Sequence, residues 1–252
     1  MTGGQGSADR RSAAGLAALP ALLAPGAVLL ARAAQGRVLL PALATLFVYP
    51  VMAALLLRGR RLAALAAALL WAASLSISII AATRRDPVSM QHVVLNGPAY
   101  RDEMFAFIRS GSGRESDPAR FVPQHVLHFL AFSLVAAGTG GLLGIALGAI
   151  LVGYMSYYVG ALAAAGGAPW TALLLGWPPW AILRVVGFVL VGIGLAEPLL
   201  LAARRRLDGA AAARLPYRPW YIVAGLLLVG DVLLKFFLAP AWAALLRPCL
   251  GP

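Results

Sequence analysis

Long apolar stretches separated by short polar breaks dominate the chain. Five stretches reach or exceed the ~20 apolar residues that a helix needs to cross a bilayer: residues 38–57, 62–82, 128–152, 182–203 and 221–246. Two less regular apolar segments, 13–31 and 159–177, bring the number of expected spans to about seven. The pattern therefore predicts an all-α, polytopic transmembrane helix bundle with six to seven spans and one extended extramembrane loop.

The polar breaks divide the chain into four expected parts. The first, residues 1–12, is rich in glycine and serine and is expected to be a mobile tail. Three N-terminal membrane helices follow within 13–82, and an extramembrane loop occupies 83–125. A second group of membrane helices, the C-terminal bundle, fills 126–252.

Two of these parts allow a finer prediction. Residues 13–31 follow an arginine pair and resemble a signal peptide, but a retained, proline-kinked membrane helix is the favoured interpretation. In the loop, residues 100–109 predict a short amphipathic helix with Met104, Phe105 and Ile108 on its apolar side. Such a helix would lie on the membrane surface or cover the bundle.

The charged residues change this picture little. Only 12% of the 252 residues are charged, against about 25% in a soluble domain. The net charge of +12 comes mostly from arginines between the apolar segments, where they anchor loops to lipid and set topology. We therefore expect a multi-pass protein of the cell (inner) membrane whose partner is the lipid bilayer, and no nucleic-acid partner. The lone Cys249 excludes an intrachain disulfide and a cysteine metal cluster, and no cofactor is expected.

The arginines also predict an orientation. The positive-inside rule places the short, arginine-dense breaks on the inner side. With the N-terminus inside, that side holds Arg10, Arg11, Arg58, Arg60, Arg61, Arg204, Arg205, Arg206, Arg214 and Arg218. The 83–125 loop carries six arginines with five acids and is expected outside.

A glycine pattern and four ionisable residues stand out within the expected spans. Gly140, Gly144 and Gly148 recur every four residues, which predicts a smooth helix face for close packing against a second helix of the chain, with a dimer contact or substrate path as the alternative. The intramembrane polar residues are Arg184, Glu197, Asp231 and Lys235.

The four ionisable residues predict different arrangements. Arg184 and Glu197 stand at opposite ends of one span, too far apart to pair, and Arg184 could reach the interface. Asp231 and Lys235 are four residues apart with the acid first, which favours an ion pair within one helix. A structural pair and a proton or ion relay both remain open for these two residues, because an unpaired charge at such depth costs several kcal/mol.

Two histidines mark the end of the loop. His125 and His128 would share one face of a helix, and such a pair can hold a metal together with a third ligand. If the protein is an enzyme, Glu103 is the acidic residue expected to act together with the two histidines. The favoured interpretation is structural: no metal site, with His128 bonded to the loop or to headgroups at the membrane surface.

Two resemblances bear on function. "FVPQH", ending at His125, resembles the FxxxH element of CAAX-processing-type intramembrane proteases, which implies a metal-dependent hydrolase using Glu103, His125 and His128. The family's paired glutamates and later histidine have no counterpart at the right spacing.

The second resemblance covers residues 124–246. The glycine-rich "GTGGLLGIALGAILVGYMSYYVGAL", "WPPWAILRVVGFVLVGIGLAEPLL" and "VGDVLLKFFLAP" are similar to helices of the stage II sporulation protein M family of polytopic membrane proteins. This resemblance implies a permease-like or scaffolding component. The chain is therefore expected to be a non-enzymatic component of a membrane complex, with partner membrane subunits or further copies of itself, and the alternative is the intramembrane metal-dependent hydrolase.

Overall fold

The structure, a computed structural model, describes the backbone of residues 3–208 and 217–251, and the side chains of residues 12–207 and 217–251. Within these ranges the regular elements are helices. They are α1 (Gly3–Ala34), α2 (Leu39–Leu57), α3 (Arg61–Arg85), α4 (Pro87–Met90), α5 (Gly97–Ser110), α6 (Pro118–Gly138), α7 (Leu142–Ala164), α8 (Pro169–Leu175), α9 (Pro179–Asp208), α10 (Arg218–Leu246) and a final 3-10 turn, η1 (Arg247–Leu250). The expected all-α class is confirmed.

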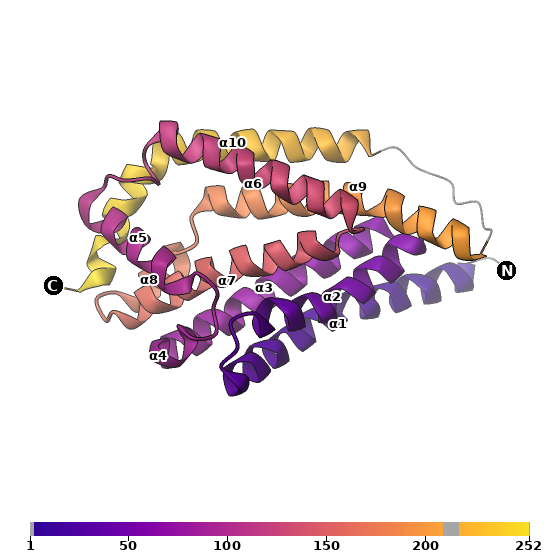
Figure 1. Cartoon of the computed structure of the whole chain (residues 1–252), viewed down its shortest axis with the longest axis horizontal. Helices are drawn as coiled ribbons and strands as arrows, with labels where there is room; N and C mark the ends of the chain where they lie inside the picture. The colour runs from indigo at the N-terminus through magenta and orange to yellow at the C-terminus, as the bar shows by residue number, and fades with distance from the viewer. Residues whose placement is uncertain (1–2, 209–216, 252) are drawn as a thin grey trace.

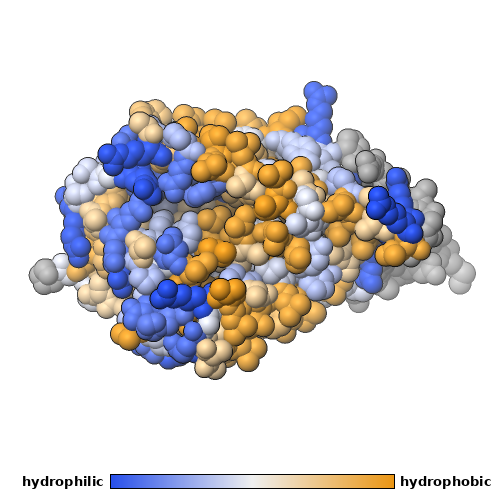
Figure 2. All heavy atoms as spheres, in the orientation of Figure 1, coloured by the Kyte–Doolittle hydropathy of each residue, from blue (hydrophilic) through white to orange (hydrophobic). Residues whose placement is uncertain are grey.

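In the part of the chain that the structure describes, seven helical segments are long and apolar enough to cross a membrane. They are Ser12–Ala34, Leu39–Leu57, Arg61–Arg85, Pro118–Gly138, Leu142–Ala164, Pro169–Leu207 and Arg218–Leu250. On the face shown in Figure 2, hydrophobic residues cover the middle of the molecule and hydrophilic residues gather toward both ends. The chain is a multi-pass membrane protein with about seven spans.

The long helices form two groups that run along the same axis (Figure 1). The first group packs α1, α2, α3 and α7 around one shared core. In the second group, α9 packs against α10 and α6. The second half of α2 and the first half of α3 contact α9, and this contact joins the two groups. Its core includes Met52, Leu55, Ala67, Ile193 and Ala196.

The segment between α3 and α6 covers one end of this bundle. Asp86 caps α4 by accepting a hydrogen bond from the Ser89 backbone N–H at 3.0 Å. The amphipathic helix expected at 100–109 is α5, and its apolar side packs on α7, α8 and the end of α10 through Met104, Phe107 and Ile108. Gly111 ends α5 with a φ of 70°, a left-handed conformation that suits glycine.

Several expected boundaries are wrong. The span expected at 128–152 contains a turn at residues 139–141, where Gly140 and Gly141 adopt φ values of 59° and 91°. The chain therefore reverses direction there, and the helices on either side are α6 and α7. The irregular span expected at 159–177 is the end of α7 followed by the short α8.

The observed loop and N-terminal tail are also shorter than the sequence pattern predicts. The loop ends at Asp117, whose carboxylate caps α6 by accepting the Ala119 N–H at 3.1 Å, with Pro118 at the first helical position. At the N-terminus, α1 begins at Gly3, so most of the expected tail is helical. Of the basic loop expected at 204–218, residues 209–216, including Arg214, lie outside the described residues.

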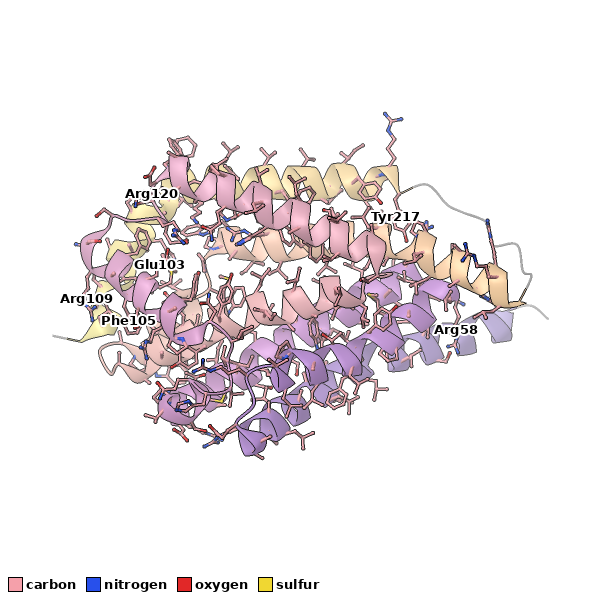
Figure 3. All side chains as sticks on the ribbon, viewed as in Figure 1. Arg58, Glu103, Phe105, Arg109, Arg120 and Tyr217 are labelled. Atoms are coloured by element: carbon pink, nitrogen blue, oxygen red, sulfur yellow. The ribbon has the colours of Figure 1, made fainter. Side chains whose placement is uncertain are left out.

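The two ends of the bundle carry different residues. Figure 3 labels Glu103, Phe105 and Arg109 at the end covered by α5, whereas Arg58 lies at the opposite end. The turns after α2 and α6 share the Arg58 end, and α4, α5 and α8 share the other (Figure 1). The segments expected on opposite sides of the membrane thus lie at opposite ends of the bundle, and which end is the inner one stays a prediction.

Candidate functional site

A cavity of about 110 Å³ lies between the two helix groups. Its walls come from α2, α3, α6, α7 and α9, and most of its lining is apolar, including Trp71, Phe132, Leu151, Phe188 and Ile193. The exceptions that matter chemically are three polar side chains: His128, Tyr154 and Arg184. The cavity thus has a mostly apolar lining with three polar side chains in it, one each from α6, α7 and α9.

Arg184 is held in place by a residue of the neighbouring helix. Its Nε and Nη2 each donate a 2.8 Å hydrogen bond to the two carboxylate oxygens of Asp231 on α10. Asp231 is almost fully buried, with 3% of its side chain exposed. Paired, bidentate geometry of this kind is the arrangement in which a buried arginine and carboxylate compensate each other best.

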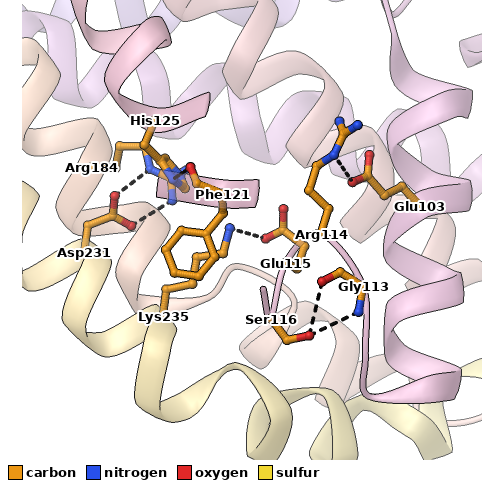
Figure 4. A network of polar contacts seen from close by, with 10 residues as sticks. All are labelled: Glu103, Gly113, Arg114, Glu115, Ser116, Phe121, His125, Arg184, Asp231 and Lys235. Carbon is orange, nitrogen blue, oxygen red and sulfur yellow. Dashed lines mark hydrogen bonds and ion pairs between the residues drawn. The ribbon is translucent and has the colours of Figure 1, made fainter. Parts of the chain in front are cut away.

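Lys235 has a different partner. Its Nζ lies 2.8 Å from Glu115, which reaches into the bundle from the segment between α5 and α6 (Figure 4). The Lys235 side chain is only 2% exposed, and its Nζ also lies 4.6 Å from the centre of the Phe121 ring, a cation–π contact. The expected Asp231–Lys235 pair is therefore wrong: each residue is paired with a residue from another element.

We call Glu115, Arg184, Asp231 and Lys235 the polar network. It contains two cations and two anions, arranged as two adjacent ion pairs. The bundle therefore buries four charges with no net charge left over, which is how intramembrane charges are commonly made tolerable. The network also ties three separate parts of the chain together: α9, α10 and the segment after α5.

The histidine pair does not sit at a loop junction. Because α6 begins at Pro118, both rings lie within its membrane-spanning segment. The Nδ1 of His125 lies 2.7 Å from the backbone carbonyl oxygen of Phe121, one turn earlier in the same helix. Among the described residues, the structure contains no hydrogen bond from His128 to the loop, which is the bond that the sequence predicts. The His128 ring instead lines the cavity.

Glu103 lies apart from both histidines. It points to Arg114, with an Oε1 to Nε distance of 3.6 Å, and is partly exposed. In Figure 4 it lies on the far side of Arg114 and Glu115 from His125. Among the residues with described side chains, no group of three or more His, Cys, Asp or Glu side chains could hold a metal ion. The structure therefore does not bring together the three residues that a hydrolase would require.

Glu197 forms a further ion pair, with a partner on α3, and neither residue of this pair lines the cavity. Its carboxylate accepts hydrogen bonds from Arg61 of α3, including one from Nε at 3.1 Å. The guanidinium of Arg61 also lies 3.9 Å from the centre of the Tyr217 ring. In the sequence Arg61 lies in a short, arginine-dense break, and nothing about that position indicates a partner 136 residues away.

The glycine pattern divides into three separate roles. Gly140 belongs to the turn before α7. A Cβ on Gly144 would lie 3.0 Å from the Cβ of Ala136, so this residue is at a tight contact between α6 and α7. A Cβ on Gly148 would meet nothing within 4 Å, since Gly148 lines the cavity.

A fourth glycine, Gly160, makes a close helix contact that the pattern did not single out. A Cβ there would lie 2.7 Å from Thr83 and 2.8 Å from the Ile80 carbonyl oxygen, both on α3. Ser156, one turn earlier, donates a 2.8 Å hydrogen bond to Ser76 across the same interface. The α3–α7 packing therefore combines a small residue with an interhelical hydrogen bond.

Several groups on the cavity wall have hydrogen-bonding capacity to spare, among them the buried Nε1 of Trp71, which has no partner among the described residues. Arg184 uses Nε and Nη2 on Asp231, and its Nη1 has no partner among the described residues. The Tyr154 hydroxyl and the His128 ring nitrogens likewise make no hydrogen bond within the described part of the chain, although the Tyr154 ring packs on Tyr100 with centroids 4.6 Å apart. These polar groups are available to a molecule in the cavity.

In comparisons with known proteins, no family model, curated protein or solved structure matches the chain. The resemblances to the stage II sporulation protein M family and to CAAX-processing-type proteases therefore stay predictions.

Proposed function

We propose that the protein is a non-enzymatic, permease-like component of the cell membrane that admits a small molecule between its two helix groups. The cavity supports this proposal more than any other feature, because it lies inside a membrane bundle and has ionisable side chains on its wall. Ionisable residues within membrane spans commonly mark the path of a substrate or an ion.

The placement of the other candidate residues also favours this proposal over a hydrolase. His125 bonds to its own helix and Glu103 is directed to Arg114, so neither points to a shared reaction centre with His128. A general base and a metal ligand set would need to converge within hydrogen-bonding reach of one substrate atom. The polar network is instead occupied in compensating its own charges.

A cysteine-accessibility experiment tests the proposal without knowledge of the substrate. In a Cys249→Ser background, Gly148→Cys places a thiol on the cavity wall, where space is open. N-ethylmaleimide reacts with the thiolate, which forms only where water reaches the sulfur. A permease-like cavity must open to water during its cycle, so the Gly148→Cys variant should be labelled.

The matched control is Leu134→Cys, on the outward face of α6 with 76% of the residue exposed toward the surrounding bilayer. This thiol should stay unlabelled because lipid covers it. If Gly148→Cys is as unreactive as Leu134→Cys in native membranes, the cavity is sealed and the permease-like proposal is wrong.

A scaffolding role is a second candidate, and the arrangement of α10 favours it. Its most extensive packing is against α9. Its outer side presents Leu226, Val229, Leu233, Phe236 and Phe237. A photo-crosslinking residue at Phe237 should then join α10 to one partner subunit or a second copy, whereas crosslinks to lipid alone would exclude this use of α10.

A further inference from the structure

We infer that the cavity binds an apolar chain through an uncharged carbonyl group, with the carbonyl oxygen at Arg184, Tyr154 and His128. This inference rests on the proposed function and names the class of molecule that enters. It is carried by the combination of a mostly apolar cavity with these three hydrogen-bond donors in its lining.

The hydrogen-bond donors in the cavity lining determine which polar group the bound molecule must carry. Nη1 of Arg184 can only donate, the Tyr154 hydroxyl can donate, and a neutral His128 ring carries one N–H. These groups require an acceptor oxygen. An apolar molecule without one would leave the donors unpaired in a low-dielectric site, which is costly.

The charge balance of the polar network determines that this acceptor is uncharged. Asp231 already neutralises Arg184 through both of its oxygens, and Glu115 neutralises Lys235. A carboxylate or phosphate at Nη1 would therefore meet no unmatched positive charge and would lie near the carboxylate of Asp231. A carbonyl oxygen accepts the same hydrogen bonds without this repulsion.

The size of the cavity determines how much of the molecule is enclosed. A volume of about 110 Å³ is somewhat smaller than the ~150 Å³ engineered cavity known to hold benzene. The cavity can therefore enclose the carbonyl and a short part of a chain. The rest of the chain would then lie outside the cavity.

Trp71 provides a reporter for the test. Its ring lines the cavity and is 4% exposed. Brominated chains quench tryptophan fluorescence on contact, so purified protein is titrated with three chains of equal length: dibrominated stearic acid, its methyl ester and dibrominated octadecane. The difference between the parent and a Trp71→Phe variant isolates the signal from the cavity.

We expect the methyl ester to bind most tightly and the hydrocarbon most weakly, with the ionised acid binding more weakly than the ester. Tyr154→Phe, which removes one donor but keeps the ring, should reduce the preference for ester over hydrocarbon by up to about tenfold, the value of one good hydrogen bond. Equal quenching by ester and hydrocarbon would overturn the inference, and so would tighter binding of the ionised acid.

A pair of glycine variants locates the binding. Gly148→Leu fills the cavity and should abolish quenching by the ester, whereas Gly225→Leu, an equally open helix position on the outer face of α10, should not. Quenching that survives Gly148→Leu would place the chain elsewhere and overturn the inference. If Gly148→Cys is labelled but the ester does not bind, this inference alone is wrong. If Gly148→Cys is not labelled, the proposed function is wrong.

Discussion

Arg184 and Asp231 join α9 to α10 through two hydrogen bonds of 2.8 Å each, in a segment of the protein that spans the membrane. The pair has a consequence for stability. The first part of α10 packs on α9 through this pair and the apolar contacts around Leu190, Val191 and Ala224, whereas its last turns pack on α5 and α8 through a buried core that includes Trp242. The Lys235–Glu115 pair adds a second link, to the segment after α5.

Removing one partner of the Arg184–Asp231 pair should be costly. We expect Asp231→Leu to destabilise the protein by about 3–5 kcal/mol, because it leaves the Arg184 charge uncompensated inside the bundle. The double variant Arg184→Leu/Asp231→Leu should recover much of this loss, since it buries no charge. Thermal unfolding in one detergent measures both. If the double variant is no more stable than Asp231→Leu, the two residues do not act as a pair.

The two cavity-side glycines of α7 should differ in what they tolerate. Gly144→Leu is expected to lower stability by about 1–3 kcal/mol, because its side chain would push α7 away from Ala136 of α6. Gly148→Leu should be neutral or slightly stabilising, since its side chain enters open space and glycine disfavours helices by about 0.5–1 kcal/mol. The melting temperatures of the two purified variants decide this. Equal losses at both positions would contradict the packing described above.

The comparison of these glycines shows what the sequence could and could not predict. Long apolar runs predicted the number of spans and the places of five of them, because a membrane helix must present such runs to lipid, but the spans expected at 128–152 and 159–177 were misplaced. The same apolar runs concealed the turn at residues 139–141, since glycines are common both in tightly packed membrane helices and in turns. Which glycine faces a helix and which faces a cavity depends on the neighbouring helices.

The candidate site shows a similar division. The four ionisable residues were recognisable because charges within apolar runs are rare. Their partners were not, because Glu115 and Arg61 lie in polar segments where a charge needs no explanation. The spacing of Asp231 and Lys235 predicts an ion pair between them. In the folded protein each of the two instead pairs with a residue of another segment. Donors such as Tyr154 gave no signal in the sequence.

The topology can be tested at exposed positions on opposite ends. In a Cys249→Ser background, Val38→Cys and Ser112→Cys should react with a membrane-impermeant thiol reagent from outside the cell. Leu207→Cys, at the arginine-rich end of α9, should react only after the membrane is opened. If Leu207→Cys and Ser112→Cys react from the same side, the orientation or the number of spans is wrong.

The α3–α4 corner should be sensitive to acid. The Ser89 backbone N–H and the Arg32 guanidinium hold the pKa of Asp86 below its ordinary value of 3.8. A carboxylate with a lowered pKa in the folded state stabilises it above its unfolded pKa, and this contribution disappears as the pH falls through the folded value. Unfolding measured from neutral pH down to pH values below 3.8 should therefore depend less on pH in Asp86→Asn than in the parent. Parallel pH profiles for both proteins would show that Asp86 makes no such contribution.

The link between Glu115 and Lys235 should matter more than the other pair in the same segment. Glu115→Gln leaves the Lys235 ammonium, 2% exposed, without its carboxylate, whereas Glu103→Gln affects a partly exposed pair with Arg114 at 3.6 Å. Exposed pairs contribute only ~0–1 kcal/mol, so Glu103→Gln should melt like the parent, and Glu115→Gln should melt clearly lower.

The same two variants can show whether this link also closes the cavity. Glu115 is the only network residue outside the membrane-spanning helices of the described structure, so its release would let the segment after α5 move away from Lys235. In the Gly148→Cys/Cys249→Ser background, N-ethylmaleimide should then label faster with Glu115→Gln than with Glu103→Gln. A lower melting temperature with unchanged labelling would make Glu115 a stabilising residue only, because a closing contact must alter access when it is removed.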